Sequence, residues 1–306
     1  MHAPRASAPP PLDELVRLAP PGARAAGPVT VLKETRVLVV RVGDVVVKAH
    51  PPETDEAGLR ARLAAVRRLP EIMLTPLALH RLDGEPPYGG RLVTIWPAGV
   101  PLTPDDLDGS GPESHGGGSP WEEGGRLLAL LHAHPPPAGL PPAGGPARVA
   151  RAVAGLAETG APARVLAPIR EAYAALPRGP GLPPRLTHGD WHLGQLVEHR
   201  GRWLLIDPDD LGVGDPAWDL ARPAAWFAAG LLEPETWERL LSAYLAAGGT
   251  AVSSGDPWRE LDAPARALTV QLAATAVATA TRAGEPLDDV AAAMVSSCER
   301  IAAAGR

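Results

Sequence analysis

The chain has 306 residues and a formal net charge of -6, from 29 Lys plus Arg against 35 Asp plus Glu. That length can bury a large core and suits two lobes or one large domain. No dense basic run is present to follow a phosphate backbone, so nucleic acid is not expected as a partner. The single cysteine, Cys298, excludes an intramolecular disulfide and a cysteine metal cage, which favours a cytoplasmic protein.

The N-terminal residues are rich in proline and lack the charged start and apolar stretch of a signal peptide. We expect a flexible extension over residues 1–27. No apolar run reaches about 18 residues without a polar, proline or glycine interruption, so no membrane partner is expected. The sequence leaves both a monomer and a homodimer open.

Residues 28–96 show the pattern of a small lobe built on an antiparallel sheet. A helix that Thr54 caps is expected, with Leu59 and Leu63 on its apolar stripe. Gly43 and Asp44 form a two-residue hairpin turn between two of the expected strands. The strands are expected at 29–32, 36–42, 45–49, 77–81 and 91–96.

Residues 97–306 are predicted to contain a hinge at 96–102 and then a mainly helical lobe. Apolar residues at helical spacing predict helices at 121–133, 235–247, 263–283 and 287–304. His132 and His134 lie at the end of the first of these helices, where they are expected to cap it. The segment 108–120, rich in Gly and Ser, is expected to be a mobile excursion. The fold class is therefore α+β, with a sheet-rich first lobe and a helical second lobe.

Lysine is rare in this chain, because Lys33 and Lys48 are the only two and arginine supplies the other basic residues. Lys48 lies at the end of a β-branched run, 45–49, that is typical of a strand. The ammonium group of Lys48 would then project from a sheet. An ordinary edge-strand lysine explains this placement equally well.

The stretch 187–195 places a carboxylate, Asp190, in a tight polar loop, and a strand farther on ends in Ile206 and Asp207. Phosphoryl transfer needs one carboxylate to receive or orient the proton of the attacking hydroxyl. It needs another carboxylate, with a side-chain oxygen, to hold Mg²⁺ against the phosphates. These residue types therefore suggest phosphoryl transfer, although Asp is also common in turns.

The motifs together resemble the aminoglycoside phosphotransferase and choline kinase family, whose signature is His-Gly-Asp-x-x-x-x-Asn, a strand ending Ile-Asp, and Gly-Asp-Pro-x-x-Asp-Leu-Ala. This chain has His188-Gly189-Asp190, then Ile206-Asp207, then the run 214–221. The segment 128–132 is similar to the family's Leu-x-x-Leu-His helix. The resemblance covers about residues 29–245.

This resemblance implies a two-lobed protein kinase-like fold with a nucleotide, ATP or GTP, between the lobes. It implies that Asp190 is the catalytic base or hydroxyl-positioning group, that Asp207 binds Mg²⁺, and that Lys48 contacts the α- and β-phosphates. Asp215 and Asp219 match positions that brace the catalytic loop. The second substrate would be a small molecule that accepts phosphate on a hydroxyl.

Three positions depart from the family pattern. Gln195 stands where the family has Asn; it keeps an amide oxygen for the metal, and the string His-Gly-Asp-x-His-x-Gly-Gln resembles the maltokinase branch. No glycine-rich loop lies between residues 29 and 40 to cradle phosphates. Glu56 is the candidate partner of Lys48, because the family's usual position holds Arg62; a solvated first-turn glutamate explains Glu56 equally well.

Two other functions remain open on the sequence alone. His188, Asp190 and His192 alternate as the ligands of a metallohydrolase would. A kinase-like binding module without transfer activity, a pseudokinase, is the second alternative. An aminoglycoside-like antibiotic, a sugar or an amino alcohol would all suit the acceptor site, for which the sequence offers an acidic and aromatic set: Trp191, Asp209, Asp210, Trp226 and Glu233.

Overall fold

The computed structural model describes residues 12–83, 89–103, 106, 119–177, 179 and 181–305. Contacts within the chain divide it into two compact units. The first contains the described residues up to Leu102 together with Val197–Pro208. The second contains the described residues of Thr103–Leu196 and the chain from Asp209 onward. Most of the segment expected to be mobile, 108–120, lies outside the described residues.

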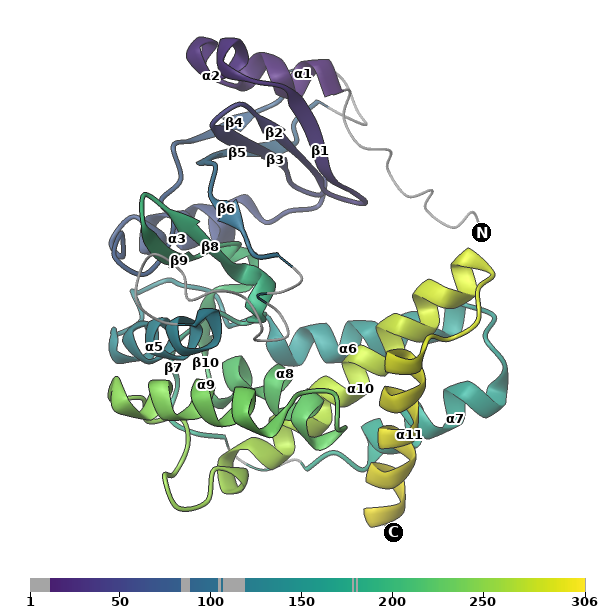
Figure 1. Ribbon diagram of the computed structural model, residues 1–306. Helices are drawn as coiled ribbons and strands as arrows, with labels where there is room; N and C mark the ends of the chain where they lie inside the picture. The colour runs from purple at the N-terminus through teal and green to yellow at the C-terminus, as the bar shows by residue number, and fades with distance from the viewer. Residues whose placement is uncertain are drawn as a thin grey trace. The chain divides into compact units, whose positions relative to one another are not determined.

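The first unit is built on an antiparallel sheet with the strand order β1-β2-β3-β5-β4 (Figure 1). The predicted turn is confirmed, because Gly43 and Asp44 join β2 to β3 and Val42 pairs with Val45. Gly43 has a positive φ of 57°, which a residue without a Cβ adopts at no steric cost. The strands are β1 (Val29–Glu34), β2 (Leu38–Val42), β3 (Val45–Ala49), β4 (Ala78–Arg81) and β5 (Leu92–Pro97).

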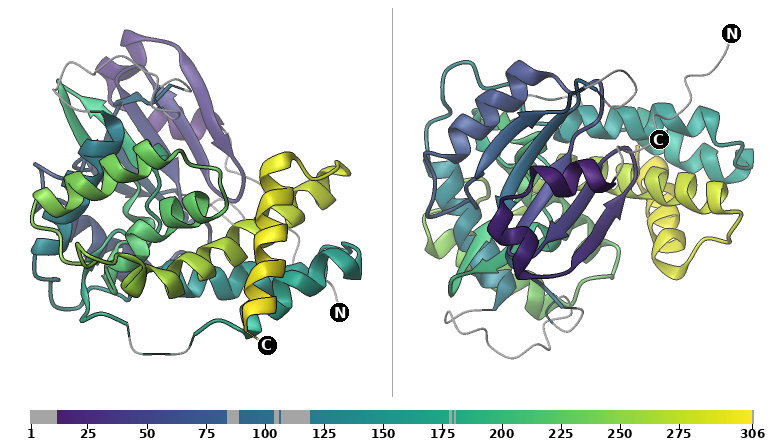
Figure 2. Two further views of the ribbon diagram at one scale, coloured as in Figure 1. Left: turned by 60° about the horizontal axis from the view of Figure 1, so that its bottom comes forward. Right: turned by 90° about the horizontal axis from the view of Figure 1, so that it is seen from above.

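Two short helices precede this sheet, α1 (Leu12–Leu18) and α2 (Pro21–Ala26). Figures 1 and 2 show them lying on the sheet, and Leu15 and Ala23 are buried in the same core as the strand residues. The expectation of a flexible extension is therefore wrong for residues 12–26. The apolar side chains of this segment gain a buried surface on the sheet, which its high proline content concealed.

A third helix, α3 (Glu56–Val66), follows β3. Its N-cap is Asp55, whose carboxylate accepts hydrogen bonds from the backbone N–H groups of Ala57 and Gly58. The cap therefore lies one residue beyond the predicted Thr54, whose hydroxyl donates to the Pro51 carbonyl instead. An aspartate accepts strongly at this position, so the shift costs the helix nothing.

The first unit also includes a small sheet with the order β6-β8-β9, formed by β6 (Val100–Pro101), β8 (Leu196–His199) and β9 (Arg202–Leu205). The division of the chain therefore differs from the expected one, in which everything after residue 96 belonged to the second lobe. The cause is visible at Leu74, which packs with Val197 and Leu204 and whose N–H donates to the Leu205 carbonyl.

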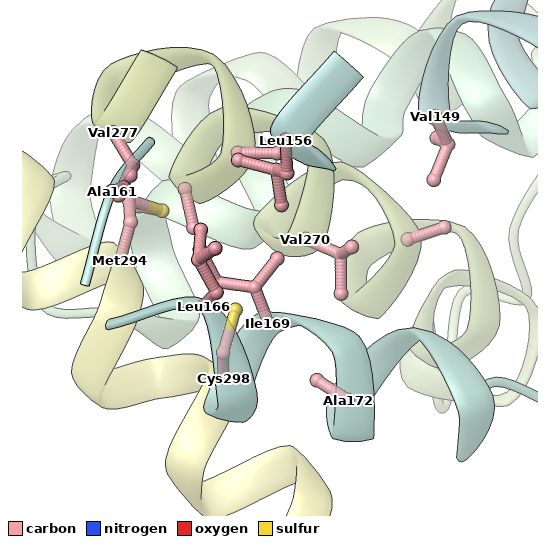
Figure 3. Close-up of a cluster of buried hydrophobic side chains, with 13 residues drawn as sticks. Val149, Leu156, Ala161, Leu166, Ile169, Ala172, Val270, Val277, Met294 and Cys298 are labelled. Carbon is pink, nitrogen blue, oxygen red and sulfur yellow. The ribbon is translucent and has the colours of Figure 1, made fainter. Parts of the chain in front are cut away.

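The second unit is mainly helical, as predicted. A core cluster lies where α6, α7, α10 and α11 meet, and Figure 3 shows the sulfur of Cys298 inside it. Burial raises the pKa of this thiol to about 12, so the cysteine is a packing residue. The helices are α5 (Pro120–Ala133), α6 (Gly145–Gly155), α7 (Ala163–Ala174), α8 (Ala217–Ala228), α9 (Pro234–Ala246), α10 (Trp258–Ala283) and α11 (Asp289–Ala304).

Two short strands in this unit, β7 (Arg185–Thr187) and β10 (Gly212–Gly214), pair antiparallel. Short 3-10 helices lie beside them: η2 (Leu193–Gln195) and η3 (Pro208–Asp210) follow β7 and precede β10. Within the described ranges, none of the helices is both long and apolar enough to cross a bilayer.

Leu15→Ala tests whether α1 belongs to the first unit's core. Leu15 is fully buried, so its truncation should lower the free energy of unfolding by about 2–5 kcal/mol. Leu12→Ala is the matched control on the same helix, because Leu12 is 38% exposed and should cost less than about 1 kcal/mol. Urea unfolding of both variants measures the difference, and equal effects would contradict the packing of α1.

Candidate active site

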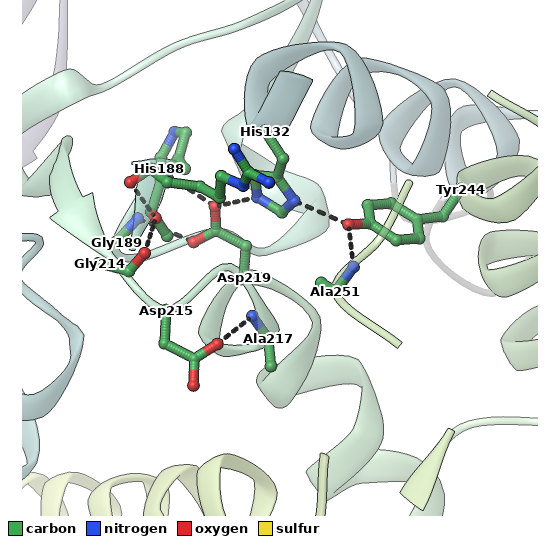
Figure 4. A network of polar contacts seen from close by, with 11 residues as sticks. His132, His188, Gly189, Gly214, Asp215, Ala217, Asp219, Tyr244 and Ala251 are labelled. Atoms are coloured by element: carbon green, nitrogen blue, oxygen red, sulfur yellow. Dashed lines mark hydrogen bonds and ion pairs between the residues drawn. The ribbon is translucent and has the colours of Figure 1, made fainter. Parts of the chain in front are cut away.

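The loop that follows β7 is fixed by one buried carboxylate. Asp219, on α8, accepts a hydrogen bond from the backbone N–H of His188 at 2.6 Å and another from that of Gly189 at 2.8 Å (Figure 4). Its side chain is fully buried. The predicted bracing role of Asp219 is therefore confirmed, and these bonds set the backbone immediately before Asp190.

The same carboxylate also contacts His132, at the end of α5. The ring Nε2 of His132 lies 3.0 Å from Asp219 Oδ2, and its Nδ1 lies 2.9 Å from the Tyr244 hydroxyl. The Tyr244 hydroxyl also accepts from the backbone N–H of Ala251. If Nε2 donates to Asp219 and Nδ1 accepts from the Tyr244 hydroxyl, each hydrogen bond in this series has one donor and one acceptor. Burial raises the pKa of Tyr244 to about 12, so the hydroxyl stays protonated.

His132 is therefore a buried member of the loop's support, and the expectation that it caps the end of α5 is wrong. The capping position at that end belongs to His134. The spacing of apolar residues on α5 places position 132 on the buried face, but the distant partners Asp219 and Tyr244 leave no local signal in the sequence.

Trp191, next to Asp190, anchors the loop to the helical core. Its side chain is buried and packs edge-on against Trp121 of α5, with ring centroids 6.5 Å apart and an interplanar angle of 73°. Gly124 gives it room, since a Cβ there would lie 2.7 Å from the indole ring. Trp191 is therefore a packing residue and does not line an acceptor site.

Asp190 is held between two arginines that the sequence analysis missed. Arg148, in the first turn of α6, places Nη2 2.8 Å from Asp190 Oδ2. Arg222, one turn after Asp219 on α8, places Nη2 2.8 Å from Asp190 Oδ1. The Asp190 side chain is 17% exposed. Both carboxylate oxygens are thus ion-paired, which fixes the orientation of the group.

A second carboxylate, Asp210, completes this cluster through Arg148, whose Nη1 lies 2.7 Å from Asp210 Oδ2. Burial raises the pKa of Asp210, and the Arg148 charge opposes that shift. Burial likewise lowers the pKa of Arg222, and the Asp190 charge opposes it. Arg148, Asp190, Asp210 and Arg222, here called the Asp190 cluster, therefore contain two cations and two anions.

Glycine is required where the backbone meets Asp210. Gly189 has φ 85°, and a Cβ on it would overlap the Asp210 carbonyl oxygen. A Cβ on Gly144, the residue before α6, would overlap the Asp210 carboxylate. These close contacts explain glycine in the His-Gly-Asp motif and before the helix that carries Arg148.

In the first unit, the structure brings two predicted site residues together. Lys48 on β3 places Nζ 2.6 Å from Asp207 Oδ1, although the two are 159 positions apart in sequence. The Lys48 side chain is 12% exposed and that of Asp207 is 33% exposed. Asp207 has φ 57°, a left-handed conformation that is uncommon outside glycine and concentrates at functional sites.

Glu56 does not take the predicted place beside Lys48. Its carboxylate is hydrogen-bonded to Arg60, one turn farther along α3, and to Arg81 of β4. The hydrogen bond from Arg60 is the main reason why the pKa of Glu56 is lowered. Both arginines satisfy the glutamate at the surface of the unit, so the alternative interpretation of Glu56, as a solvated first-turn residue, describes it better.

The remaining predicted residues lie in the second unit. Gln195 ends η2 and is largely buried, and its backbone N–H donates to the His192 carbonyl. Asp215 accepts from the N–H groups of Leu182 and Ala217, so it braces the start of α8; burial raises its pKa. Trp226 is half-buried against the helical core, as packing residues are.

Asp207 has a partly exposed carboxylate, a group of the kind through which proteins hold Mg²⁺ while phosphates and water fill its other positions. In the part of the chain that the structure describes, no group of three or more His, Cys, Asp or Glu residues is arranged to hold a metal. The metallohydrolase alternative requires such a group.

Asp219→Ala tests the support of the loop. Loss of the carboxylate leaves two buried N–H groups without their acceptor, so the free energy of unfolding should fall by about 3–5 kcal/mol. Asp262→Ala is the control, because that aspartate pairs with Arg266 on the surface of α10 and should contribute less than about 1 kcal/mol. Urea unfolding compares them, and a small loss for Asp219→Ala would contradict the bracing role.

The sequence and the structure were compared with those of known proteins. A search of curated proteins by sequence found no match. Among solved structures, a choline/ethanolamine kinase family protein from Mesorhizobium loti is 21% identical, with a TM-score of 0.59 over 94% of this chain and 92% of that chain. Choline kinase from Cryptosporidium parvum Iowa II is 11% identical, with a TM-score of 0.59 over 90% of this chain and 89% of that chain.

A thermostable mutant of aminoglycoside phosphotransferase APH(4)-Ia, in a ternary complex with AMP-PNP and hygromycin B, is 16% identical, with a TM-score of 0.57 over 91% of this chain and 94% of that chain. These likenesses confirm the predicted kinase-like α+β fold. The model of the phosphotransferase enzyme family matches residues 34–263. Since that match spans well over half of the sequence, the chain belongs to the phosphotransferase enzyme family.

Proposed function

We propose that this protein transfers the γ-phosphate of ATP or GTP to a hydroxyl of a small molecule. The observation that carries the proposal is the Lys48–Asp207 ion pair, which joins two residues of distant segments at 2.6 Å. A phosphate-binding lysine and a metal-binding aspartate are two parts that phosphoryl transfer requires. Membership in the phosphotransferase enzyme family supports the same reaction.

In this proposal Lys48 binds the α- and β-phosphates and Asp207 binds Mg²⁺. The metal, when bound, neutralises the charge of the phosphates during transfer. Asp190 orients the acceptor hydroxyl, for which its fixed carboxylate is suited: each oxygen keeps a lone pair beyond its arginine contact. The role of Gln195 as a further metal ligand remains a prediction.

The roles proposed for Lys48, Asp207 and Asp190 suggest a function for each region of the chain. We propose that residues 28–96 contain the nucleotide-binding elements and that 97–306 contain the catalytic loop and the acceptor site. We further propose a cytoplasmic enzyme, as a monomer or homodimer. An aminoglycoside-like antibiotic, a sugar and an amino alcohol are the candidate acceptors, and a role in antibiotic resistance would follow from the first of them.

One observation favours a second candidate function, a kinase-like module that binds a ligand without transferring phosphate. Both oxygens of Asp190 are already ion-paired with arginine. An acceptor hydroxyl would therefore share each oxygen with a guanidinium. The substitution of Gln195 for the family's Asn points in the same direction.

Transfer of γ-phosphate from ATP and GTP, with Mg²⁺, to pooled aminoglycosides, sugars and amino alcohols tests the proposal. Asp190→Ala should lower the transfer rate by about 10²- to 10⁴-fold while nucleotide binding stays near the wild-type level. Asp207→Ala should weaken Mg²⁺-dependent nucleotide binding, because it removes the metal's carboxylate. Fluorescence titration of nucleotide measures binding separately from turnover.

Asp262→Ala serves as the control, since that surface carboxylate on α10 has no role in the proposed reaction. Full activity in Asp190→Ala would overturn the assignment. Nucleotide binding by the wild type without transfer to any acceptor would favour the binding module.

A further inference from the structure

The Asp190 cluster presents a surplus of hydrogen-bond donors at the residue proposed to orient the acceptor. Each guanidinium has five N–H donors and no acceptor. Arg148 contacts Asp190 and Asp210, and Arg222 contacts Asp190. The Nε atoms of both arginines are buried and lack a hydrogen-bond partner among the described residues. These Nε atoms are out of reach of a substrate, which can approach only the exposed part of each arginine: 30% of the Arg148 side chain and 13% of that of Arg222.

The two arginines of the cluster keep their positive charge more reliably than Asp210 keeps its negative charge. An arginine stays charged at every physiological pH even where burial lowers its pKa, as for Arg222. Burial instead raises the pKa of Asp210, which moves that carboxyl towards its neutral form. The two guanidinium charges offset the two carboxylates, so the cluster offers no net negative charge to attract a cation.

Two members of the acidic and aromatic set that the sequence suggested for a cationic acceptor are occupied by other side chains. Trp191 is buried against Trp121, and Asp210 is paired with Arg148. An ammonium group has donors only, so it cannot satisfy a guanidinium. Close to Arg148 and Arg222 it would also meet two charges of its own sign. Hydroxyl, carboxylate and phosphate oxygens can all accept from them.

We propose that the acceptor is oxygen-rich and has no positive charge near the reacting hydroxyl, as in a neutral sugar or a hydroxy acid, and that Arg148 and Arg222 select it against aminated acceptors. This inference rests on the proposed phosphotransferase function and narrows its acceptor class. Arg148 is the more accessible determinant, because its side chain is 30% exposed whereas that of Arg222 is 13% exposed.

Matched acceptors test this selectivity. We would measure kcat/KM with ATP and Mg²⁺ for glucose, maltose, glucuronate and glycerate, beside glucosamine, choline and kanamycin. Glucose and glucosamine differ in one hydroxyl replaced by an ammonium, and we expect the wild type to prefer glucose by about tenfold or more. Glucuronate and glycerate show whether the oxygen acceptors belong to an anion or to a neutral sugar.

Arg148→Gln should lower the glucose-to-glucosamine ratio by about tenfold, since it removes a cation but keeps a similar length. If the substitution displaces Asp190, kcat/KM should fall equally for both acceptors, and the ratio is unaffected by that shared loss. Arg148→Lys keeps the charge and should retain the preference. Arg222→Gln provides a second test if Arg148→Gln fails to fold. Arg266→Gln is the control: this arginine, 33% exposed, also pairs with an aspartate, but on α10.

Preferred transfer to glucosamine, choline or kanamycin would overturn this inference and leave the phosphotransferase function standing. An unchanged ratio in both Arg148→Gln and Arg222→Gln would also overturn it. Absence of transfer to all seven compounds, with folded protein, would count against the proposed function and against this inference together.

Discussion

A buried carboxylate that accepts two adjacent backbone N–H groups is the interaction on which the loop that carries Asp190 depends. Asp219 receives the N–H groups of His188 and Gly189 and is itself held by His132. An unpaired N–H in this core would cost about 1–3 kcal/mol, so the loop has little freedom to adopt another path. The support extends through Tyr244 to Ala251, which ties the loop to α5, α9 and the segment that follows α9.

The same helix determines the surroundings of Asp190. Asp219 and Arg222 are three positions apart on α8, so they share one face of the helix and both reach the loop. Asp219 fixes the backbone before Asp190, and Arg222 fixes its side chain. The close approach of Asp210 to Gly144 and Gly189 brings in Arg148 from the start of α6. Backbone position and carboxylate orientation are thus set by the same few contacts.

Sequence alone predicted the elements with strong local patterns and the residues within a motif. The strands around Gly43 and four helices of the second unit follow from local patterns, and the bracing by Asp219 follows from the resemblance to the family motif. The helices at 12–26 were missed because their stability comes from burying Leu15 and Ala23 on a sheet that forms later in the chain. Local composition, rich in proline, contains no sign of that surface.

Side-chain partners were the harder problem. Glu56 was matched to Lys48 by helical spacing, but spacing defines only a face of the helix. The carboxylate pairs instead with Arg60 of the same helix and with Arg81 of β4. No feature of the sequence identified Arg148 as a site residue, because its partners Asp190 and Asp210 follow it by more than 40 positions. The sequence did contain a feature that could have identified Arg222: it directly follows the Asp-Leu-Ala run on the helix that supports the loop. Long-range ion pairs need the fold before they can be assigned.

The arginine pairing also bears on what Asp190 contributes to the reaction. Phosphoryl transfer through a loose transition state needs little proton abstraction early on, and it depends chiefly on holding the nucleophile in line. A carboxylate whose two oxygens are each bound by a guanidinium has a fixed orientation. Its remaining lone pairs then point in defined directions, to which an acceptor hydroxyl can donate. The geometry of the cluster therefore fits the role proposed for Asp190, the alignment of the acceptor hydroxyl.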